Sequence, residues 1–446
     1  IYADVVNNDD LPDIIFARMT AQDEAHLETM ITKVINYETN PPSNPDFYDH
    51  PVSALGWQTD RWFQICAETV VGYFKNEQGK NPVRINAVCD GNPEVDPWST
   101  GQNTDVVMDY FGPDGLGYIP ATPQELGGFT GGTAADVEDA INDGTFMLMH
   151  RDHGYELGWG DPDFSNANIN NLTNNDLCYV LSINCKSGRF DYFNECFAEK
   201  FHRHTYNGNN SGALGIIGAT ANSYSFVNDA YVWGLYDHLW TDFMPDVETE
   251  ITPRGLMPAF ANAAGKYFLE QSNWPYNTTN KPVTYHLFHA HGGAFSSIYS
   301  EVPMNLSVVH ENALLAGLDQ FQITADEGSL IALSIEGEIL GTAEGTGSEI
   351  SIPIAPQYPP TIIDVVVTKP NYHRYHATVQ VIPPDGPYII QNDVMINDEN
   401  GNNNGMMDHG ESILLGLEVK NVGNENGDNV EVSISTDDPY ITMTQH

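Results

Sequence analysis

The sequence predicts an α/β domain with a largely parallel, buried sheet, followed by a β-sandwich and the start of a further β domain. Four short apolar runs separated by helical or loop stretches predict the sheet, since strands covered on both faces read as continuous apolar runs. After about residue 300 apolar and polar residues alternate, and Gly and Pro punctuate them, which is typical of an immunoglobulin-like sandwich. We expect an α/β domain over residues 1–300, a sandwich over 301–384 and part of a β unit over 385–446.

Two amphipathic helices are expected near the start of the chain. In residues 21–37 apolar side chains recur at helical spacing, and Thr20 with Asp23 reads as a capping box. Asn-Pro-Pro at 40–42 ends this helix. The same spacing predicts a second helix over residues 60–75.

The expected strands of the buried sheet place polar residues at one edge. These strands are residues 83–90, 145–150, 178–185 and 212–219. In open α/β sheets, sites lie beyond the carboxyl ends of the strands. The residues found there are Asp90, His153, Cys185 and the stretch 220–229.

The charge balance excludes two classes of partner. The chain has 446 residues with 17 basic and 61 acidic side chains, a formal net charge of −44. Such a surface repels phosphate backbones and anionic lipid, so we expect no nucleic-acid partner and no binding to membrane surfaces. It suits calcium, cationic substrates or a salty medium, or it only keeps an extracellular protein soluble. No apolar run reaches the roughly 18 residues that a membrane span requires.

The ends of the chain suggest a processed, extracellular protein. The sequence opens on Ile1 and carries no signal peptide, which suggests a trimmed product of a longer precursor. The last β unit is too short for a complete sandwich, so further C-terminal domains of the same precursor are expected. We therefore expect a secreted or cell-surface location.

One of the five cysteines is a candidate nucleophile. An odd number of cysteines leaves at least one thiol free. A lone buried cysteine is usually inert, and we interpret four of them in that way: Cys66, Cys89, Cys178 and Cys196. Cys185 differs because it ends an expected strand next to the one followed by His153-Gly154.

A cysteine hydrolase needs a thiolate, a base and donors for the oxyanion. His153 could take the proton of the Cys185 thiol, and the backbone N–H groups of Cys185 and Gly154 could face the oxyanion. Asp90 could orient the His153 imidazole and stabilise its cation. By themselves, a lone cysteine and a His-Gly pair are weak evidence for catalysis.

A resemblance to a known family strengthens this interpretation. It is carried by His150-Arg-Asp-His-Gly-Tyr-Glu-Leu-Gly-Trp-Gly, Asn184-Cys-Lys-Ser-Gly-Arg-Phe-Asp-Tyr and Leu11-Pro-Asp-Ile-Ile-Phe-Ala-Arg-Met-Thr. These segments resemble the gingipain family of cysteine peptidases, over roughly residues 1–300. The resemblance implies a caspase-like αβα sandwich and a secreted endopeptidase with Cys185 as nucleophile, His153 as base and Asp90 as the acidic residue behind the histidine.

The resemblance also implies partners and a specificity. Gingipains cleave after Arg or Lys and hold that side chain with acids, for which Asp105 and Asp229 are the expected equivalents here. Protein or peptide substrates and a bound pro-segment are the expected partners, and no organic cofactor is expected. Two departures stand out: Tyr155 replaces a small polar residue after His-Gly, and the additional N-terminal subdomain of the family has no counterpart in the sequence.

A loop near the end of the chain has the spacing of a calcium site. Residues 400–411 place oxygen side chains at positions 1, 3, 5, 9 and 12 of an EF-hand loop, with Gly405 at position 6. The expected ligands of a structural Ca²⁺ are Asp398, Asn400, Asn402, Asn404, Asp408 and Glu411. The alternative is an Asn/Gly-rich hairpin turn. The histidine cluster at 286, 289 and 291 lacks a suitably spaced fourth ligand, so packed or solvated side chains are expected there.

Two other functions remain open at this point. One is a narrow sorting or maturation peptidase for exported proteins. The other is a non-catalytic surface or filament-forming protein built on a peptidase-like scaffold. Thiol titration separates the last from an enzyme, because a catalytic cysteine beside a histidine alkylates well below the free-thiol pKa of about 8.5.

Overall fold

The computed structural model describes residues 3–7, 9–129, 131–248, 251–253, 255–272 and 278–444. The chain divides into two compact units. The first is Ile1–Met304 with Pro370–His373, and the second is Asn305–Lys369 with Arg374–His446. None of the described helices combines the length and apolar character that crossing a membrane requires.

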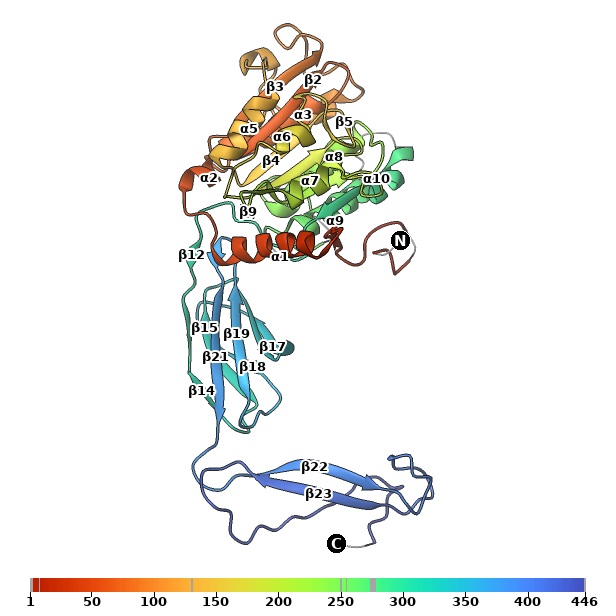
Figure 1. Ribbon diagram of the computed structural model, residues 1–446, viewed down its shortest axis with the longest axis vertical. Helices are drawn as coiled ribbons and strands as arrows, with labels where there is room; N and C mark the ends of the chain where they lie inside the picture. Colours follow the sequence, from red (N-terminus) through yellow and green to blue (C-terminus); the bar gives the residue numbers. More distant parts are fainter. Residues whose placement is uncertain are drawn as a thin grey trace. The chain divides into compact units, whose positions relative to one another are not determined.

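A seven-stranded sheet forms the centre of the first unit (Figure 1). In spatial order its strands are β1 (Ala17–Arg18), β11 (Phe288–His291), β10 (Ala213–Ala219), β7 (Cys178–Ile183), β4 (Met147–Arg151), β2 (Val52–Gln58) and β3 (Val83–Asp90). The five strands from β10 to β3 are mutually parallel, whereas β11 is antiparallel to β10 and parallel to β1. The expected α/β fold with a mostly parallel sheet is confirmed.

Helices cover both faces of this sheet, as Figure 1 shows. The core on one face includes side chains of α3 (Phe63–Asn76), α4 (Thr104–Phe111), α8 (Val227–Leu239), α9 (Pro258–Gln271) and α10 (Lys281–Leu287). The core on the other face includes side chains of α5 (Ala134–Asp143), α6 (Asn166–Ile169) and α7 (Phe197–Arg203). The remaining elements of this unit are α1 (Glu24–Thr39), α2 (Pro45–Asp49), the 3₁₀ turns Pro123–Glu125 and Thr278–Asn280, and the short hairpins β5 (Gly154–Tyr155) with β6 (Gly158–Trp159) and β8 (Thr205–Tyr206) with β9 (Asn209–Asn210).

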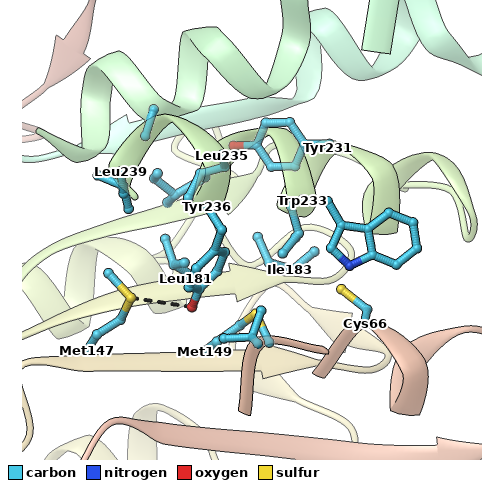
Figure 2. Close-up of a cluster of buried hydrophobic side chains, with 14 of the residues drawn as sticks. Cys66, Met147, Met149, Leu181, Ile183, Tyr231, Trp233, Leu235, Tyr236 and Leu239 are labelled. Carbon is cyan, nitrogen blue, oxygen red and sulfur yellow. Dashed lines mark hydrogen bonds between the residues drawn. The ribbon is translucent and has the colours of Figure 1, made fainter. Parts of the chain in front are cut away.

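Helix α8 packs on one face of the sheet, and alternate side chains of the central strands point toward it. Figure 2 shows Met147 and Met149 of β4 and Leu181 of β7 pointing toward α8, where the Tyr236 hydroxyl lies 3.3 Å from the Met147 sulfur. Successive strand residues point to opposite faces, so the next residue of this series in β4, Arg151, also faces α8. Each large apolar side chain buried here contributes about 2 kcal/mol of transfer free energy.

Five strands form the parallel part of the sheet, and apolar runs in the sequence predict four of them: β3, β4, β7 and β10. Strand β2 is not predicted, because Ser53 and Gly56 interrupt its apolar run. Gly56 is required there, since a Cβ at this position would collide with the Asp152 carboxylate. The first helix also begins later than expected, because Asp23 rather than Thr20 is its N-cap and accepts a 2.8 Å hydrogen bond from the His26 amide.

The second unit is a β domain. A three-stranded sheet of β13 (Val308–His310), β15 (Gln320–Ala325) and β18 (Glu349–Pro353) accompanies a five-stranded sheet of β14 (Ala313–Leu315), β21 (Tyr375–Ile382), β19 (Ile362–Thr368), β16 (Leu330–Ile335) and β17 (Glu338–Glu344). Inward-facing residues of both sheets form one core, which confirms the expected β domain. Beyond it, β22 (Ile389–Asn397) and β23 (Leu414–Asn421) form a hairpin whose loop carries the predicted calcium ligands. The short strand β20 (Tyr372–His373) belongs to the first unit, and β12 (Met304–Asn305) spans the residues at which the first unit ends and the second begins.

Candidate active site

Neighbouring strands bring Cys185 and His153 to the same edge of the sheet. Strands β4 and β7 are parallel and pair Arg151 with Ile183 at their carboxyl ends. His153 and Cys185 each follow two residues after this pair, so they stand in the same register. The structure therefore places the two predicted catalytic residues in neighbouring loops at the edge where an open α/β sheet carries its site.

A backbone amide faces the Cys185 sulfur. The Ser223 N–H donates to Cys185 Sγ at 3.3 Å, and the half-buried thiol also lies 3.8 Å from the Ser223 hydroxyl. Ser223 is itself held, because its hydroxyl donates to the Asn184 carbonyl at 2.9 Å and accepts from Asn228 Nδ2 at 2.7 Å. A fixed N–H donor stabilises a thiolate. The sequence predicts residues 220–229 at this edge but carries no signal that singles out Ser223.

His153 has an amide partner. Its Nε2 lies 2.8 Å from Oε1 of Gln58, the last residue of β2, and its ring packs edge-on against Phe63 with centroids 5.4 Å apart. Partial burial, together with the positive charges of Arg151 and Arg61, lowers the pKa of His153. A lowered pKa keeps the imidazole neutral near pH 7, as a general base requires.

Asp90 lies away from His153 in the sheet. It is the last residue of β3, and β2 separates β3 from β4, so the two strand ends are roughly 9.5 Å apart. Among the described residues no hydrogen bond joins the exposed Asp90 side chain to His153. Gln58, and not the predicted orienting acid Asp90, is the residue that contacts the His153 ring nitrogen.

The turn after His153 packs on the residue before Cys185. A Cβ on Gly154 would lie 2.5 Å from Asn184 Oδ1, so glycine is needed for this close approach. Asn184 is fixed by Nδ2 contacts of 2.8 Å to His150 Nδ1 and 2.9 Å to Ser182 Oγ. Gly154 thus packs against the side chain of the residue before Cys185, and the role of the Gly154 and Cys185 amides as an oxyanion hole stays a prediction.

Asp229 is committed to a buried ion pair. Its two carboxylate oxygens accept hydrogen bonds from Arg151 Nε at 2.6 Å and Nη2 at 3.0 Å, and the Phe226 amide donates to it at 2.8 Å. Both charged side chains are inaccessible to solvent, and the Arg151 guanidinium stacks on Phe63 at 4.2 Å. This placement argues against the prediction that Asp229 binds a substrate side chain, because its acceptor sites are already occupied.

Asp105 remains accessible. It lies in the first turn of α4, and its side chain is exposed. The Thr104 hydroxyl beside it accepts from Trp62 Nε1 at 3.0 Å, and Trp62 packs on Phe226 with ring centroids 4.8 Å apart. These contacts link the start of α4 to the segment that carries Ser223.

The histidine cluster, for which packed or solvated side chains are predicted, shows no convergence on a metal. His286 Nε2 lies 2.9 Å from Asp10, His289 Nε2 lies 3.0 Å from the His286 carbonyl, and His291 is buried, so the three histidines do not converge. In the part of the chain that the structure describes, no three His, Cys, Asp or Glu side chains are grouped as metal ligands.

The loop between β22 and β23 is cross-linked by its own side chains. The buried Asp398 accepts a 2.8 Å hydrogen bond from the Asn404 amide, and Glu411 accepts one of 2.8 Å from the Asn402 amide. Asp408 accepts from both asparagine side chains, at 2.7 and 2.8 Å. The second oxygen of Glu411 is buried and has no hydrogen-bond partner among the described residues.

Comparison with known proteins supports the resemblance to gingipains. The model of the family described as "Peptidase family C25" matches residues 1–280. Lys-gingipain of Porphyromonas gingivalis is 24% identical over 419 residues, which cover 87% of this chain and 21% of that protein. Lys-gingipain W83 of P. gingivalis is 28% identical over 279 residues, covering 56% of this chain and 15% of that protein. The chain therefore spans about a fifth of the length of these relatives.

Solved structures share the fold. The crystal structure of the Arg specific cysteine proteinase gingipain R (RGPB) superposes with a TM-score of 0.67 at 17% identity, covering 85% of this chain and 78% of that chain. The complex of P. gingivalis RgpB pro- and mature domains gives a TM-score of 0.66 at 19% identity, covering 85% and 79%. These superpositions show that this chain shares with those proteins the fold of an α/β domain followed by a β domain.

Proposed function

This chain belongs to peptidase family C25, a family of cysteine peptidases, and we propose that it hydrolyses internal peptide bonds with Cys185 as nucleophile and His153 as general base. The observation that carries this proposal is the shared register of the two residues at the ends of β7 and β4. The neutral imidazole of His153 and the amide donor at the Cys185 sulfur support it.

The reaction proceeds through a thioester. His153 takes the thiol proton, and the Cys185 thiolate attacks the carbonyl carbon of the scissile bond. The N–H groups of Cys185 and Gly154 receive the oxyanion, and the imidazolium of His153 gives its proton to the leaving amine as the C–N bond breaks. Water, deprotonated by His153, then attacks the thioester and releases the acid product and the Cys185 thiol.

Turnover of fluorogenic peptides tests the assignment. Substrates ending in Lys, Arg, Asp or an apolar residue are compared on the wild type and on Cys185→Ala, with Cys89→Ala as a control at the exposed cysteine residue of β3. We expect Cys185→Ala to lose at least about 10³-fold in kcat and Cys89→Ala to stay active. Turnover that survives in Cys185→Ala would contradict the proposal.

Cleavage after Lys or Arg is the specificity that the surroundings favour. The relatives include Lys-gingipain and an Arg specific proteinase, and the net charge of −44 attracts cationic peptides. With Asp229 paired to Arg151, the exposed Asp105 is our candidate for the acid that binds the basic side chain. Asp105→Asn should raise KM for Lys and Arg peptides about tenfold and leave apolar peptides unchanged. Equal effects on both classes would exclude Asp105 from that role.

The same comparison supports an extracellular location and a pro-segment. A gingipain of this fold has been solved as a complex of pro- and mature domains, and the acidic surface suits an extracellular protein. We therefore include secretion and a separately folded pro-segment in the proposal. Expression of the full precursor, followed by N-terminal sequencing of the released protein, tests both. A product retained in the cytoplasm without cleavage would contradict them.

The loop between β22 and β23 is proposed to bind a structural Ca²⁺. Calcium prefers carboxylate and amide oxygens, and the unpartnered Glu411 oxygen would serve as a ligand. The proposed ligands are Asp398, Asn400, Asn402, Asn404, Asp408 and Glu411. Calcium should raise the Tm of the β domain relative to EGTA, and Glu411→Gln should remove most of that increase. An identical Tm with and without calcium would contradict the site.

A further inference from the structure

We infer that Gln58 and Asp60 position the His153 imidazole, holding its proton on Nε2 and leaving Nδ1 free to act as the base. Gln58 and Asp60 come from β2 and the turn after it. They are positioning residues, because they act on the reaction through His153. The inference rests on the proposed function of His153.

The contacts of Gln58 fix which way its amide points. Gln58 Nε2 donates to Asp60 Oδ1 at 2.9 Å. A carboxylate accepts hydrogen bonds and cannot donate them, so the amide nitrogen must be the atom that faces Asp60. The amide oxygen must then face His153, whose Nε2 lies 2.8 Å from it.

This orientation determines the tautomer of the histidine. An amide oxygen only accepts, so His153 Nε2 must carry the hydrogen that bridges the 2.8 Å contact. In the neutral imidazole the other ring nitrogen, Nδ1, then has the free lone pair. That nitrogen is the one left available to take the proton of the Cys185 thiol.

The rest of the turn holds Gln58 and Asp60 in place. The Gln58 carbonyl accepts from the Arg61 amide at 3.0 Å and from Gln64 Nε2 at 3.3 Å. Arg61 Nη1 also donates to the second oxygen of Asp60 at 2.9 Å. Side chains of one turn therefore form a continuous chain of hydrogen bonds from Arg61 through Asp60 and Gln58 to His153.

An amide orients the histidine without adding a charge beside it. The charged groups that act on His153 are Arg151 and Arg61, which lower its pKa, and Asp161 and Asp60, which raise it. A carboxylate in direct contact would raise the pKa further, because it stabilises the imidazolium. With Gln58 in that position, His153 stays unprotonated and able to act as a base at a lower pH.

Substitutions at both positions test the inference. Gln58→Ala should lower kcat by about 10- to 100-fold with KM changed less than about twofold, since the substrate still binds but the base is no longer held in one tautomer. Gln58→Glu should retain most of kcat while the acidic limb of the pH–rate profile moves upward by about one pH unit. Asp60→Asn should give an intermediate loss, because an asparagine no longer dictates the orientation of the Gln58 amide.

A matched control is Gln322→Ala, which removes a surface glutamine with a comparable 2.9 Å side-chain hydrogen bond in the β domain. Its kcat and pH profile should equal those of the wild type. If Gln58→Ala also matches the wild type in kcat and in its acidic limb, the inference is overturned.

A second readout does not depend on turnover. In the Cys185→Ala protein labelled with ¹⁵N-histidine, NMR should show a protonated Nε2 and an unprotonated Nδ1 for His153, and Gln58→Ala should mix the two tautomers. A predominant Nδ1–H tautomer in Cys185→Ala would overturn the inference even if Gln58→Ala fails to fold. Turnover that persists in Cys185→Ala would instead refute the proposed function, so the two failures are distinguishable.

Discussion

The Cys185 sulfur receives its hydrogen bond from a main-chain group, the Ser223 amide, and Asn228 of α8 holds Ser223 in place. Asn228→Ala should free Ser223 and slow alkylation of Cys185 by chloroacetamide at pH 7 several-fold, because the thiolate loses a fixed donor. Asn76→Ala, which removes a surface asparagine bonded to the Gly117 carbonyl, is the control and should leave the alkylation rate unchanged. Equal rates in all three proteins would show that the Ser223 amide does not activate the thiol.

Gly154 is the second residue whose backbone matters more than its side chain. Gly154→Ala would press a methyl group against the Asn184 side chain and displace the Gly154 backbone, whose amide is a proposed oxyanion donor. We expect kcat to fall by about 10²- to 10³-fold, the loss typical of one missing oxyanion donor. Steady-state kinetics at saturating peptide measure this, and a change below about threefold would remove Gly154 from the oxyanion hole.

At the scale of elements, the Arg151–Asp229 ion pair ties β4 to α8, two residues before His153 in the chain. Asp229→Ala would leave a fully buried guanidinium without its partner and should lower the free energy of unfolding by about 3–5 kcal/mol. Replacing both residues with apolar ones should recover most of that loss. Urea denaturation measures all three proteins, with Asp105→Asn as an exposed control expected within about 0.5 kcal/mol of the wild type. A small effect of Asp229→Ala would mean that water solvates Arg151.

Helix α3, which packs on the sheet, carries a buried acid, Glu68, whose ionisation makes the free energy of unfolding depend on pH. Burial raises the pKa of Glu68 to about 7, although Asn86 and Arg84 lie beside it. Between the unfolded pKa of about 4.3 and pH 7 the folded chain binds the extra proton, so stability is lost as pH rises through this window. Glu68→Gln does not titrate. Its Tm relative to the wild type should therefore be higher at pH 8 than at pH 5, and a difference independent of pH would contradict this account.

The elements also show what the sequence could and could not reveal. Strands β3, β4, β7 and β10 were recognised from apolar runs, and with them the edge that carries Cys185 and His153. Asp90 is predicted beside His153 because it ends a strand at the same edge of the sheet and matches the acidic position of the gingipain family, yet β2 lies between β3 and β4 in space. The order of strands in a sheet is set by packing rather than by local sequence pattern. The sequence alone therefore predicts neither the separation of Asp90 from His153 nor the contact of Gln58 with His153.

The buried residues around the candidate site could not be predicted from the sequence, for a related reason. Asp229 and Arg151 are 78 positions apart in the sequence, and nothing local distinguishes a paired acid from a substrate-binding one. Ser223 likewise acts through its amide, which every residue except proline possesses. The β domain was recognisable because alternating strands carry their own signal.

At the scale of the whole molecule, the net charge of −44 dominates the long-range electrostatics. Self-repulsion among acidic groups destabilises the compact state, and salt screens it over a Debye length of about 10 Å at 0.1 M. Raising NaCl from about 20 to 200 mM should therefore raise the Tm by a few degrees. The same change should lower kcat/KM for Lys and Arg peptides, since the attraction of cationic substrates weakens. A Tm that falls with added salt would contradict this view of the surface.

The most direct test of the central claim is site-resolved alkylation of the native protein at pH 6 with iodoacetamide, followed by peptide mapping. Cys185 should react first among the five cysteines and at least tenfold more slowly in His153→Ala. Cys89 is an exposed residue, but its sulfur is half-buried and donates to the Trp57 carbonyl at 2.8 Å. Burial raises the pKa of this thiol to about 12, so it should react slowly in both proteins. A Cys185 that reacts no faster than Cys89, or at the same rate with and without His153, would contradict a thiolate–imidazole pair in this chain.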